Sequence, residues 1–337
     1  MNLMSDSQTY NKIEDLESSG GEDRWGVNGI TVGFVVTEAN VDTMAGDYFT
    51  AMELGEELSK QLGWKIVYLE RSKNDYDTSG LDVLIVMLDK YDVSQIQQAK
   101  PNLLKIAWAR NWFKRWVNWE WFQDYDLVWC SSEKAANFVS YKIPAIPVSV
   151  LRIGTNYERF SQGIFKPELK SDYCFVGSYW YNRREIIDCL DPREIPFNFA
   201  LYGANWKKFP QFQNAYRGQV KYTEIPHIYA STKIAIDDAN SVTKSWGSAN
   251  SRIFDAIASG ALVISNGQLG NEDAFDGELP IYSSSEDLRK LLEQYLTNEQ
   301  QRLAKVERLK TIVREKHTYE YRAKSASQSI RSYVSFQ

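Results

Sequence analysis

A polar loop enters an amphipathic segment at residues 245–266, which read SWGSANSRIFDAIASGALVISN. The free backbone N–H groups of a helix start favour an anion, and Arg252 adds a planar, permanently charged guanidinium suited to a phosphate. Asp255 lies one turn further on the same side of the expected helix. A carboxylate at that position can accept hydrogen bonds from two vicinal ribose hydroxyls. The segment therefore predicts a site for a ribose and its phosphates.

An ion pair between Arg252 and Asp255 on a solvated helix is the alternative, because surface pairs of this kind are common and weak. The polar loop, the helix start and the small residues Ala258, Ser259 and Gly260 occur together here. Small residues let a helix end tightly before the next strand. Their combination favours the binding site over an isolated pair.

Two further candidates follow strands in the N-terminal half. Gly46 and Asp47 come after the first strand, where a glycine permits close approach to phosphates. Asp47 is either a helix N-cap or a catalytic residue that contacts the acceptor hydroxyl or the donor sugar. Arg110 ends the strand at 104–109 and either offsets charge on a departing diphosphate or forms a structural salt bridge.

Residues 108–129 are rich in aromatic side chains. Trp112, Trp116 and Trp119 are spaced as one stripe of a helix. Three interpretations stay open: packing in the core or between domains, stacking on acceptor sugars, and weak peripheral contact with a membrane surface.

Short apolar runs alternate with amphipathic stretches along the rest of the chain, which is typical of βαβ units. Two such series in succession predict two Rossmann-like domains facing across a cleft, with ligands at the carboxyl ends of the strands. The expected strands are at 30–37, 66–69, 81–87, 104–109, 127–130, 147–153, 173–176, 197–202, 234–236 and 261–265. Helices are expected after the first strand and at 183–190, 251–259, 286–296 and 298–332.

The predicted organisation has four parts. Residues 1–28 form a flexible acidic leader, 29–154 an acceptor domain, 155–310 a donor domain and 311–337 a C-terminal helix. The periodicity lapses around residues 154–170, where we expect the interdomain linker.

Composition excludes several classes of protein. Residues 1–24 carry most of the formal charge of −5, so a basic footprint for nucleic acid is absent. No signal-like start and no membrane-spanning apolar run is found, and the odd number of cysteines, 3, suits reduced thiols in the cytoplasm. With 2 histidines and no paired cysteines, we expect no metal site. No GxGxxG follows the first strand, which disfavours an NAD enzyme.

The segment SRIFDAIASGALVISN resembles the donor-binding helix of the group 1 glycosyltransferase superfamily, R-x-F-E-A-x-A-x-G followed by an apolar strand. The resemblance is closest to the spore-maturation-like branch and covers residues 170–325 as an ordered set of motifs. Its other members are Phe175–Ser178 followed by Arg183 and Arg184, Leu201–Trp206, Gly218–Ile225 and His317–Arg322.

The resemblance implies a GT-B fold and a nucleotide-diphosphate sugar as donor substrate, with no cofactor and no metal. With this resemblance we expect transfer of a hexosyl group to a glycan, lipid-linked or other hydroxyl acceptor, as in polysaccharide biosynthesis, and we expect retention of configuration in preference to inversion. Asp255 would bind the ribose, and Arg252 with the loop residues would bind the diphosphate. The implied donor-site residues are Gly46, Gly177, Ser178, Arg183, Tyr202, Gly203, Tyr222, Ser245, Trp246, Ser248, Asn250, Ser251, Arg252 and Asp255.

Two positions depart from the family pattern. Gly247 stands where the first of two acidic residues is usual, and Asp255 replaces the commoner glutamate. A retaining enzyme would use the leaving phosphate to assist the acceptor, whereas an inverting one would need a base such as Asp47 or Glu38. A nucleotide-sugar epimerase and a catalytically silent sugar-nucleotide-binding module are the alternative functions.

Overall fold

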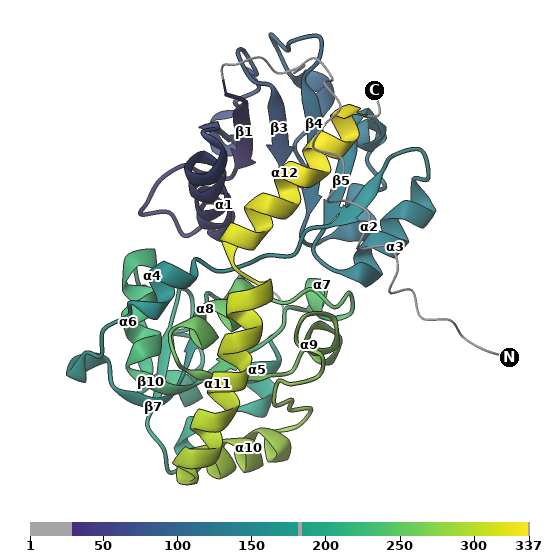
Figure 1. The fold of residues 1–337 in the computed structure, drawn as a ribbon. Helices are drawn as coiled ribbons and strands as arrows, with labels where there is room; N and C mark the ends of the chain where they lie inside the picture. Colours follow the sequence, from purple (N-terminus) through teal and green to yellow (C-terminus); the bar gives the residue numbers. More distant parts are fainter. Residues whose placement is uncertain (1–28, 181–183, 336–337) are drawn as a thin grey trace, which may run out of the picture.

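The computed structural model describes residues 29–180 and 184–335; the predicted leader and Arg183 lie outside them. Within the described residues the strands form a six-stranded sheet, ordered β2-β1-β3-β4-β5-β6, and a five-stranded sheet, ordered β11-β10-β7-β8-β9. All pairings between these strands are parallel. The sheets belong to two domains, one above the other in Figure 1, as the alternating pattern predicts.

The N-terminal domain contains the six-stranded sheet. Its strands β1 and β3–β5 are buried apolar runs, as expected for a parallel sheet covered on both faces. Helix α1 ends at Leu62 and is capped by Gly63, which has a left-handed backbone (φ 68°) and donates its N–H to the carbonyl of Ser59. The elements are β1 (Thr31–Val36), α1 (Gly46–Leu62), β2 (Lys65–Glu70), β3 (Val83–Val86), β4 (Leu104–Ala109), α2 (Phe113–Trp116), β5 (Leu127–Cys130), α3 (Glu133–Lys142) and β6 (Val148–Val150).

The C-terminal domain contains the five-stranded sheet. The predicted strands are present, and the short edge strand β9 is an addition that the pattern did not predict. The elements are α4 (Tyr157–Ser161), β7 (Ser171–Val176), α5 (Glu185–Cys189), β8 (Phe199–Tyr202), β9 (Tyr216–Gly218), α6 (Ile225–Ala230), β10 (Thr232–Asp237), α7 (Ser241–Lys244), α8 (Ser251–Ala258), β11 (Leu262–Ser265), α9 (Gln268–Phe275) and α10 (Ser285–Thr297).

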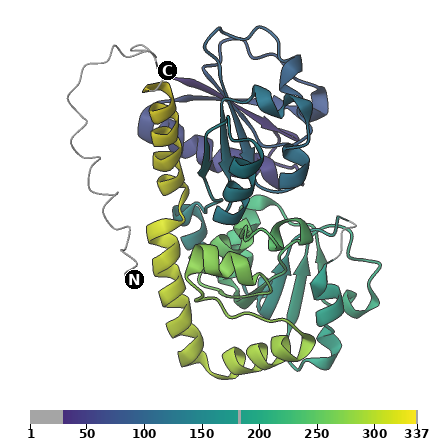
Figure 2. The same cartoon turned by 90° about the vertical axis from the view of Figure 1, so that its right-hand side faces the viewer.

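The long helix predicted at 298–332 is wrong as a single element. The chain forms α11 (Glu299–Lys316) and α12 (Tyr319–Ser335), separated by His317 and Thr318. The break is tertiary in origin, because Thr318 pairs with Thr155 of the linker in a parallel bridge. In Figures 1 and 2, α11 lies along the C-terminal domain and α12 crosses to the N-terminal domain.

The aromatic segment is mainly part of the core. Trp108, Trp116 and Trp129 are fully buried, and Nε1 of Trp108 donates to the carbonyl of Leu151 over 2.9 Å. The predicted helical stripe is wrong, because α2 holds only Phe113–Trp116 and Trp112 has a left-handed backbone (φ 54°). Packing therefore accounts for the most buried rings.

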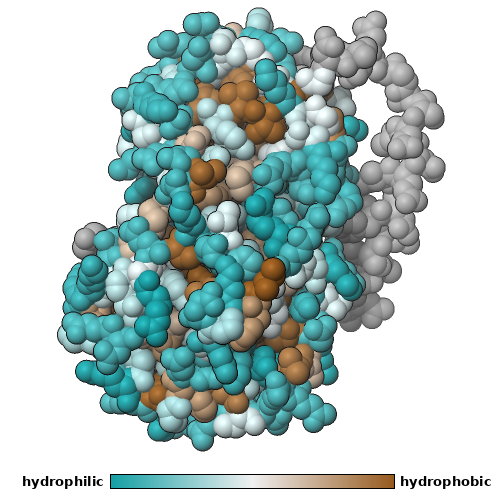
Figure 3. All heavy atoms as spheres, turned by 90° about the vertical axis from the view of Figure 1, so that its left-hand side faces the viewer, coloured by the Kyte–Doolittle hydropathy of each residue, from teal (hydrophilic) through white to brown (hydrophobic). Residues whose placement is uncertain are grey.

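The described helices include none that is both long and apolar enough to cross a bilayer. Hydrophilic side chains cover most of the face shown in Figure 3, with smaller apolar groups among them.

Candidate functional site

A cavity of about 300 Å³ lies between the two domains. Ligand sites of open α/β sheets lie at the carboxyl ends of strands where the strand order reverses. In the C-terminal domain this point falls between β7 and β10, and Val176, Gly177 and Ser178 at the end of β7 line the cavity. The other lining residues are Thr43, Met44, Gly46, Phe49, Thr50, Gly154, Trp180, Arg184, Gly203, Val220, Tyr222, Ile225, Tyr229, Ser251, Arg252, Asp255 and Tyr319.

Arg252 is held rigidly at the cavity wall. Its Nη1 lies 2.6 Å from Oδ1 of the fully buried Asp237, and its Nε donates to the carbonyl of Val176 over 2.7 Å. The guanidinium also lies 4.5 Å from the ring centroid of Phe175. A Cβ at Gly177 would stand 2.7 Å from Nη2 of Arg252, so glycine is required there for the guanidinium to keep this place. These contacts fix its orientation before any ligand arrives.

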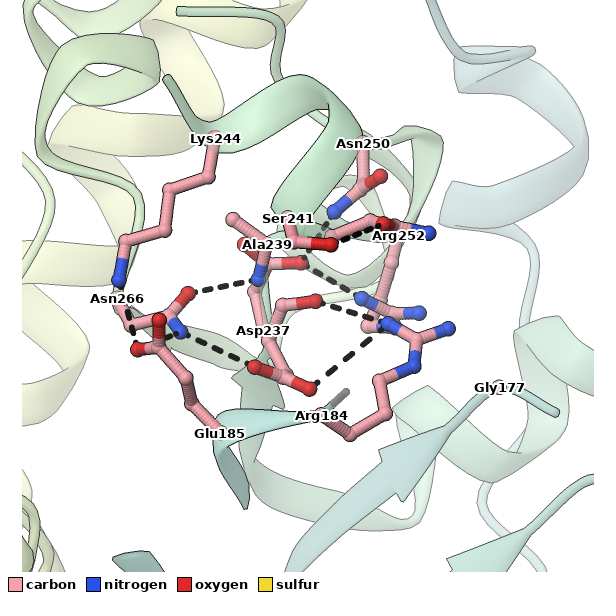
Figure 4. Close-up of polar contacts among 12 residues, drawn as sticks. Gly177, Arg184, Glu185, Asp237, Ala239, Ser241, Lys244, Asn250, Arg252 and Asn266 are labelled. Carbon is pink, nitrogen blue, oxygen red and sulfur yellow. Dashed lines mark hydrogen bonds and ion pairs between the residues drawn. The ribbon is translucent and has the colours of Figure 1, made fainter. Parts of the chain in front are cut away.

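Arg184 places a second positive charge at the cavity wall, next to Arg252 (Figure 4). It donates to the carbonyl of Asp238 over 3.1 Å and to that of Ser178 over 3.2 Å. Burial lowers its pKa, and the charge of Arg252 lowers it further. Burial also raises the pKa of Asp238 to about 6, opposed by the charge of Arg184. The two guanidiniums are thus held close together by carbonyls and buried carboxylates.

Asp255 lies on α8, one turn beyond Arg252. It is 7% exposed, and its Oδ1 accepts a hydrogen bond of 2.6 Å from Oγ1 of Thr155. Burial raises the pKa of Asp255 well above its usual range; the bond from Thr155 opposes this shift, and the charge of Glu53 adds to it. The carboxyl is therefore placed at the cavity by a residue of the interdomain linker.

The opposite wall joins the two domains through aromatic rings. Phe49 of α1 stacks on Tyr222 with ring centroids 4.2 Å apart, and the hydroxyl of Tyr222 donates to Oε1 of Glu53 over 3.0 Å. Asn156 and Arg159 also bind the carboxylate of Glu53, over 2.6 and 2.8 Å. Burial raises the pKa of Glu53, and Arg159 opposes that shift.

Eight of the donor-site residues expected from the sequence line this one cavity. They are Gly46, Gly177, Ser178, Gly203, Tyr222, Ser251, Arg252 and Asp255.

The loop before α8 points elsewhere. Trp246 packs against Phe113 and Phe138 of the N-terminal domain, with ring centroids 5.3 and 4.8 Å apart. Oγ of Ser248 lies 2.8 Å from that of Ser131. These two residues therefore serve the contact between the domains. The sequence of the loop did not reveal this, because it does not show which way the side chains face.

Three other expected residues also lie outside the cavity lining. Ser245 is exposed, the side-chain amide of Asn250 donates to Asp237 over 3.1 Å, and Tyr202 is buried in the domain core. For Asn250 the structure shows a role in holding Asp237.

Neither residue proposed as catalytic lines the cavity. Asp47 is not the N-cap of α1, which is Ala45; its carboxylate instead accepts a hydrogen bond of 2.5 Å from the backbone N–H of Thr37. Arg110 makes no salt bridge among the described residues, and its buried Nε has no hydrogen-bond partner there. Burial lowers the pKa of Arg110, opposed by the charge of Asp47.

Several residues that contribute to the site were not predicted from the sequence. Asp237 ends strand β10 and Thr155 lies in the linker, so each meets α8 only through the fold. Arg184 could have been predicted as a donor-site residue, because it follows the glycine-containing turn after β7. Of the two neighbouring arginines, only Arg183 was predicted to bind the donor. Tyr319 belongs to a motif near the C-terminus and reaches the cavity because α12 returns to the N-terminal domain.

The described part of the chain contains no cluster of three or more histidine, cysteine, aspartate or glutamate side chains suited to a metal ion. Metal independence stays a prediction.

Known proteins resemble both the sequence and the fold. Residues 183–328 match a family described as glycosyl transferase-like, and no curated protein matches the chain. Sucrose-phosphate synthase from Thermosynechococcus elongatus has a TM-score of 0.66 at 12% identity, covering 91% of this chain and 100% of that one.

Two other solved structures are similar over the same length. AviGT4, a glycosyltransferase involved in avilamycin A biosynthesis, has a TM-score of 0.62 at 11% identity and covers 91% of this chain and 99% of its own. Anabaena Alr3699/HepE in complex with UDP-glucose has a TM-score of 0.62 at 9% identity, with 90% and 100% covered. This chain therefore has the GT-B fold, and its C-terminal part is similar to the glycosyl transferase-like family.

Proposed function

We propose that this protein is a glycosyltransferase that takes a hexosyl group from a nucleoside-diphosphate sugar bound in the cavity between its domains. The observation that carries the proposal is the placement of Arg184, Arg252 and Asp255 around one cavity at the strand-order reversal. The glycosyl transferase-like family match and the solved complex of Alr3699/HepE with UDP-glucose support a donor of this class.

The residues have distinct roles in this proposal. Arg252 and Arg184 bind the diphosphate and stabilise the charge that develops on it as it leaves. Since both are fixed before the donor binds, little reorganisation is needed during the reaction. Asp255 accepts hydrogen bonds from the ribose hydroxyls, and Tyr222 lies toward the base.

In the transfer, the oxygen of an acceptor hydroxyl bonds to the anomeric carbon of the sugar. The bond from that carbon to the diphosphate oxygen breaks, and its electron pair leaves with the nucleoside diphosphate. We propose retention of configuration without a metal ion, with the acceptor proton passing to the leaving phosphate. The acceptor is a hydroxyl of a glycan or lipid-linked molecule.

The free cysteines Cys130, Cys174 and Cys189 suit the reducing cytoplasm.

Donor turnover tests the proposal. The protein is incubated with the glucose conjugates of UDP, GDP, dTDP and CDP, with and without glycan acceptors, and nucleoside diphosphate and sugar products are separated. Formation of a glycoside with release of nucleoside diphosphate is expected. An isomerised sugar nucleotide without acceptor would instead identify an epimerase. Donor binding without turnover across many acceptors would identify a silent binding module.

Variants locate the site. Arg252→Lys keeps a positive charge beside Asp237 but loses the planar fork, and we expect donor affinity to fall by about tenfold. Arg184→Ala should have a similar or larger effect. Arg289→Ala on α10 removes an equal charge from an exposed position outside the cavity lining and serves as the control. Full donor affinity in both cavity variants would show that the diphosphate binds elsewhere.

A further inference from the structure

Both passages of the chain between the domains meet at Thr155. The linker arrives there from β6, and the return passage to α12 runs through His317 and Thr318. The backbone N–H of Thr155 donates to the carbonyl of His317 over 2.9 Å, and its carbonyl accepts from the N–H of Tyr319 over 2.9 Å. Thr155 is 0% exposed, so the meeting point is sealed from solvent.

The neighbouring linker residue shows how closely the two passages approach. A Cβ at Gly154 would stand 3.0 Å from the carbonyl oxygen of His317 and 3.2 Å from the carbonyl carbon of Thr318. Arg322 adds a bond of 3.2 Å to the carbonyl of Ile153. The linker and the return passage therefore form one rigid junction.

The side chain of Thr155 connects this junction to the cavity. Its Oγ1 donates to Oδ1 of Asp255 over 2.6 Å. Within the described residues, the second carboxylate oxygen of Asp255, Oδ2, accepts no hydrogen bond. It is also absent from the fully buried polar atoms that lack a partner. Since Asp255 and Tyr319 both line the cavity, the bond from Thr155 leaves this second oxygen available there.

We propose that Thr155 is a positioning residue of the donor site. It holds the carboxylate of Asp255 toward the ribose hydroxyls and makes that orientation depend on the junction between the domains. The inference rests on the proposed function and adds to it a residue that itself touches no substrate. Ribose recognition thereby depends on the junction between the domains, although Asp255 itself belongs to the C-terminal domain.

Thr155→Val removes the donated hydrogen bond with almost no change of shape, and Thr155→Ser keeps it. The probes are UDP and its 2′,3′-dideoxy analogue, with dissociation constants measured by calorimetry on the full chain. We expect wild type and Thr155→Ser to prefer UDP by about tenfold or more. In Thr155→Val this preference should fall to about twofold, mainly through weaker binding of UDP. Because both probes are measured on the same variant, a general loss of folding cannot produce the change in their ratio.

The outcomes separate the inference from the proposed function. If Thr155→Val prefers UDP over the dideoxy analogue as strongly as wild type does, the positioning role of Thr155 is wrong, although the proposed donor site is unaffected. Equal binding of both probes by wild type would remove ribose recognition by Asp255, and the inference with it. If wild type binds GDP, dTDP or CDP in place of UDP, the comparison uses that nucleotide and its dideoxy analogue. If wild type binds none of UDP, GDP, dTDP and CDP, the proposed function fails and the inference falls too.

A double-mutant cycle gives an independent check. In an Asp255→Asn background, Thr155→Val should have little further effect on UDP affinity, because the carboxylate it positions is gone. Additive losses from the two substitutions would contradict the inference.

Discussion

Nη1 of Arg252 lies 2.6 Å from Oδ1 of Asp237, whose side chain is completely buried. The same carboxylate accepts hydrogen bonds from Asn250 over 3.1 Å and from Ser265 over 2.6 Å. Asp237 is thus saturated by groups that hold it in place, and it fixes the guanidinium at the cavity wall. The cation proposed to bind the diphosphate is therefore neutralised in part before the donor arrives.

Asp237→Ala should strongly destabilise the protein. Removing one partner of a buried ion pair leaves the other charge uncompensated and typically costs about 3–5 kcal/mol. Chemical denaturation measures the free energy of unfolding. Lys324→Ala is the matched control, because its pair with Glu320 is 65% and 62% exposed and should contribute less than about 1 kcal/mol. Equal small losses in both variants would contradict a structural role for the buried pair.

Gly177→Ala should weaken donor binding without unfolding the protein. The new Cβ would meet Nη2 of Arg252 at 2.7 Å and displace the guanidinium. We expect the dissociation constant for UDP-glucose to rise by about tenfold, the scale of one lost charged hydrogen bond. Gly270→Ala on α9 is the control, since Gly270 lies outside the cavity lining and a Cβ there meets no atom closer than 3.6 Å. A similar affinity in both variants would mean that the place of Arg252 is irrelevant to the donor.

Much of the fold follows from local patterns. Strands β4 and β5 have the predicted bounds, because each is a buried apolar run bounded by turns. The break between α11 and α12 escaped prediction because no glycine or proline marks it. It arises from the pairing of Thr318 with Thr155, residues far apart in the sequence.

The residues of the site likewise include some that could be predicted from the sequence and some that could not. Arg252 and Asp255 could be identified together, since one helix brings them to the same cavity. Their partners Asp237 and Thr155 could not, because they come from a strand and from the linker. Trp246 and Ser248 were assigned to the donor site through the resemblance of their loop to the family motif, and the structure turns them toward the N-terminal domain.

Introducing at Gly247 the acidic residue that is usual in the family pattern should destabilise the protein. Its backbone is left-handed (φ 76°), and a Cβ there would lie 3.2 Å from the carbonyl oxygen of Leu269. We expect Gly247→Glu to lower the free energy of unfolding by about 2 kcal/mol. Gly247→Asn should cost less, because asparagine tolerates this conformation better. Thermal and chemical denaturation of the two variants checks this order, and a stable Gly247→Glu protein would contradict it.

His317 should make stability fall in acid. Its Nδ1 lies 2.7 Å from Nη2 of Arg322 and so must accept that hydrogen bond, which leaves Nε2 to donate to the carbonyl of Ala274 over 2.7 Å. Burial lowers the pKa of His317 to about 3, and the charge of Arg322 adds to the shift. In the unfolded chain the pKa is about 6.5. The neutral ring thus contributes its full stability above pH 6.5, and the contribution is lost as the pH falls from there toward 3 because only the unfolded chain takes up the proton.

His317→Gln removes this titration while keeping a donor and an acceptor in the side chain. We expect the free energy of unfolding of wild type, relative to that of the variant, to fall by about 3 kcal/mol between pH 7 and pH 4. Denaturant titrations at intermediate pH values measure the difference, and carboxylates common to both proteins cancel in it. A constant difference across this range would show that His317 is protonated in the folded protein as readily as in the unfolded chain, and the bond from Arg322 to a neutral ring would then be wrong.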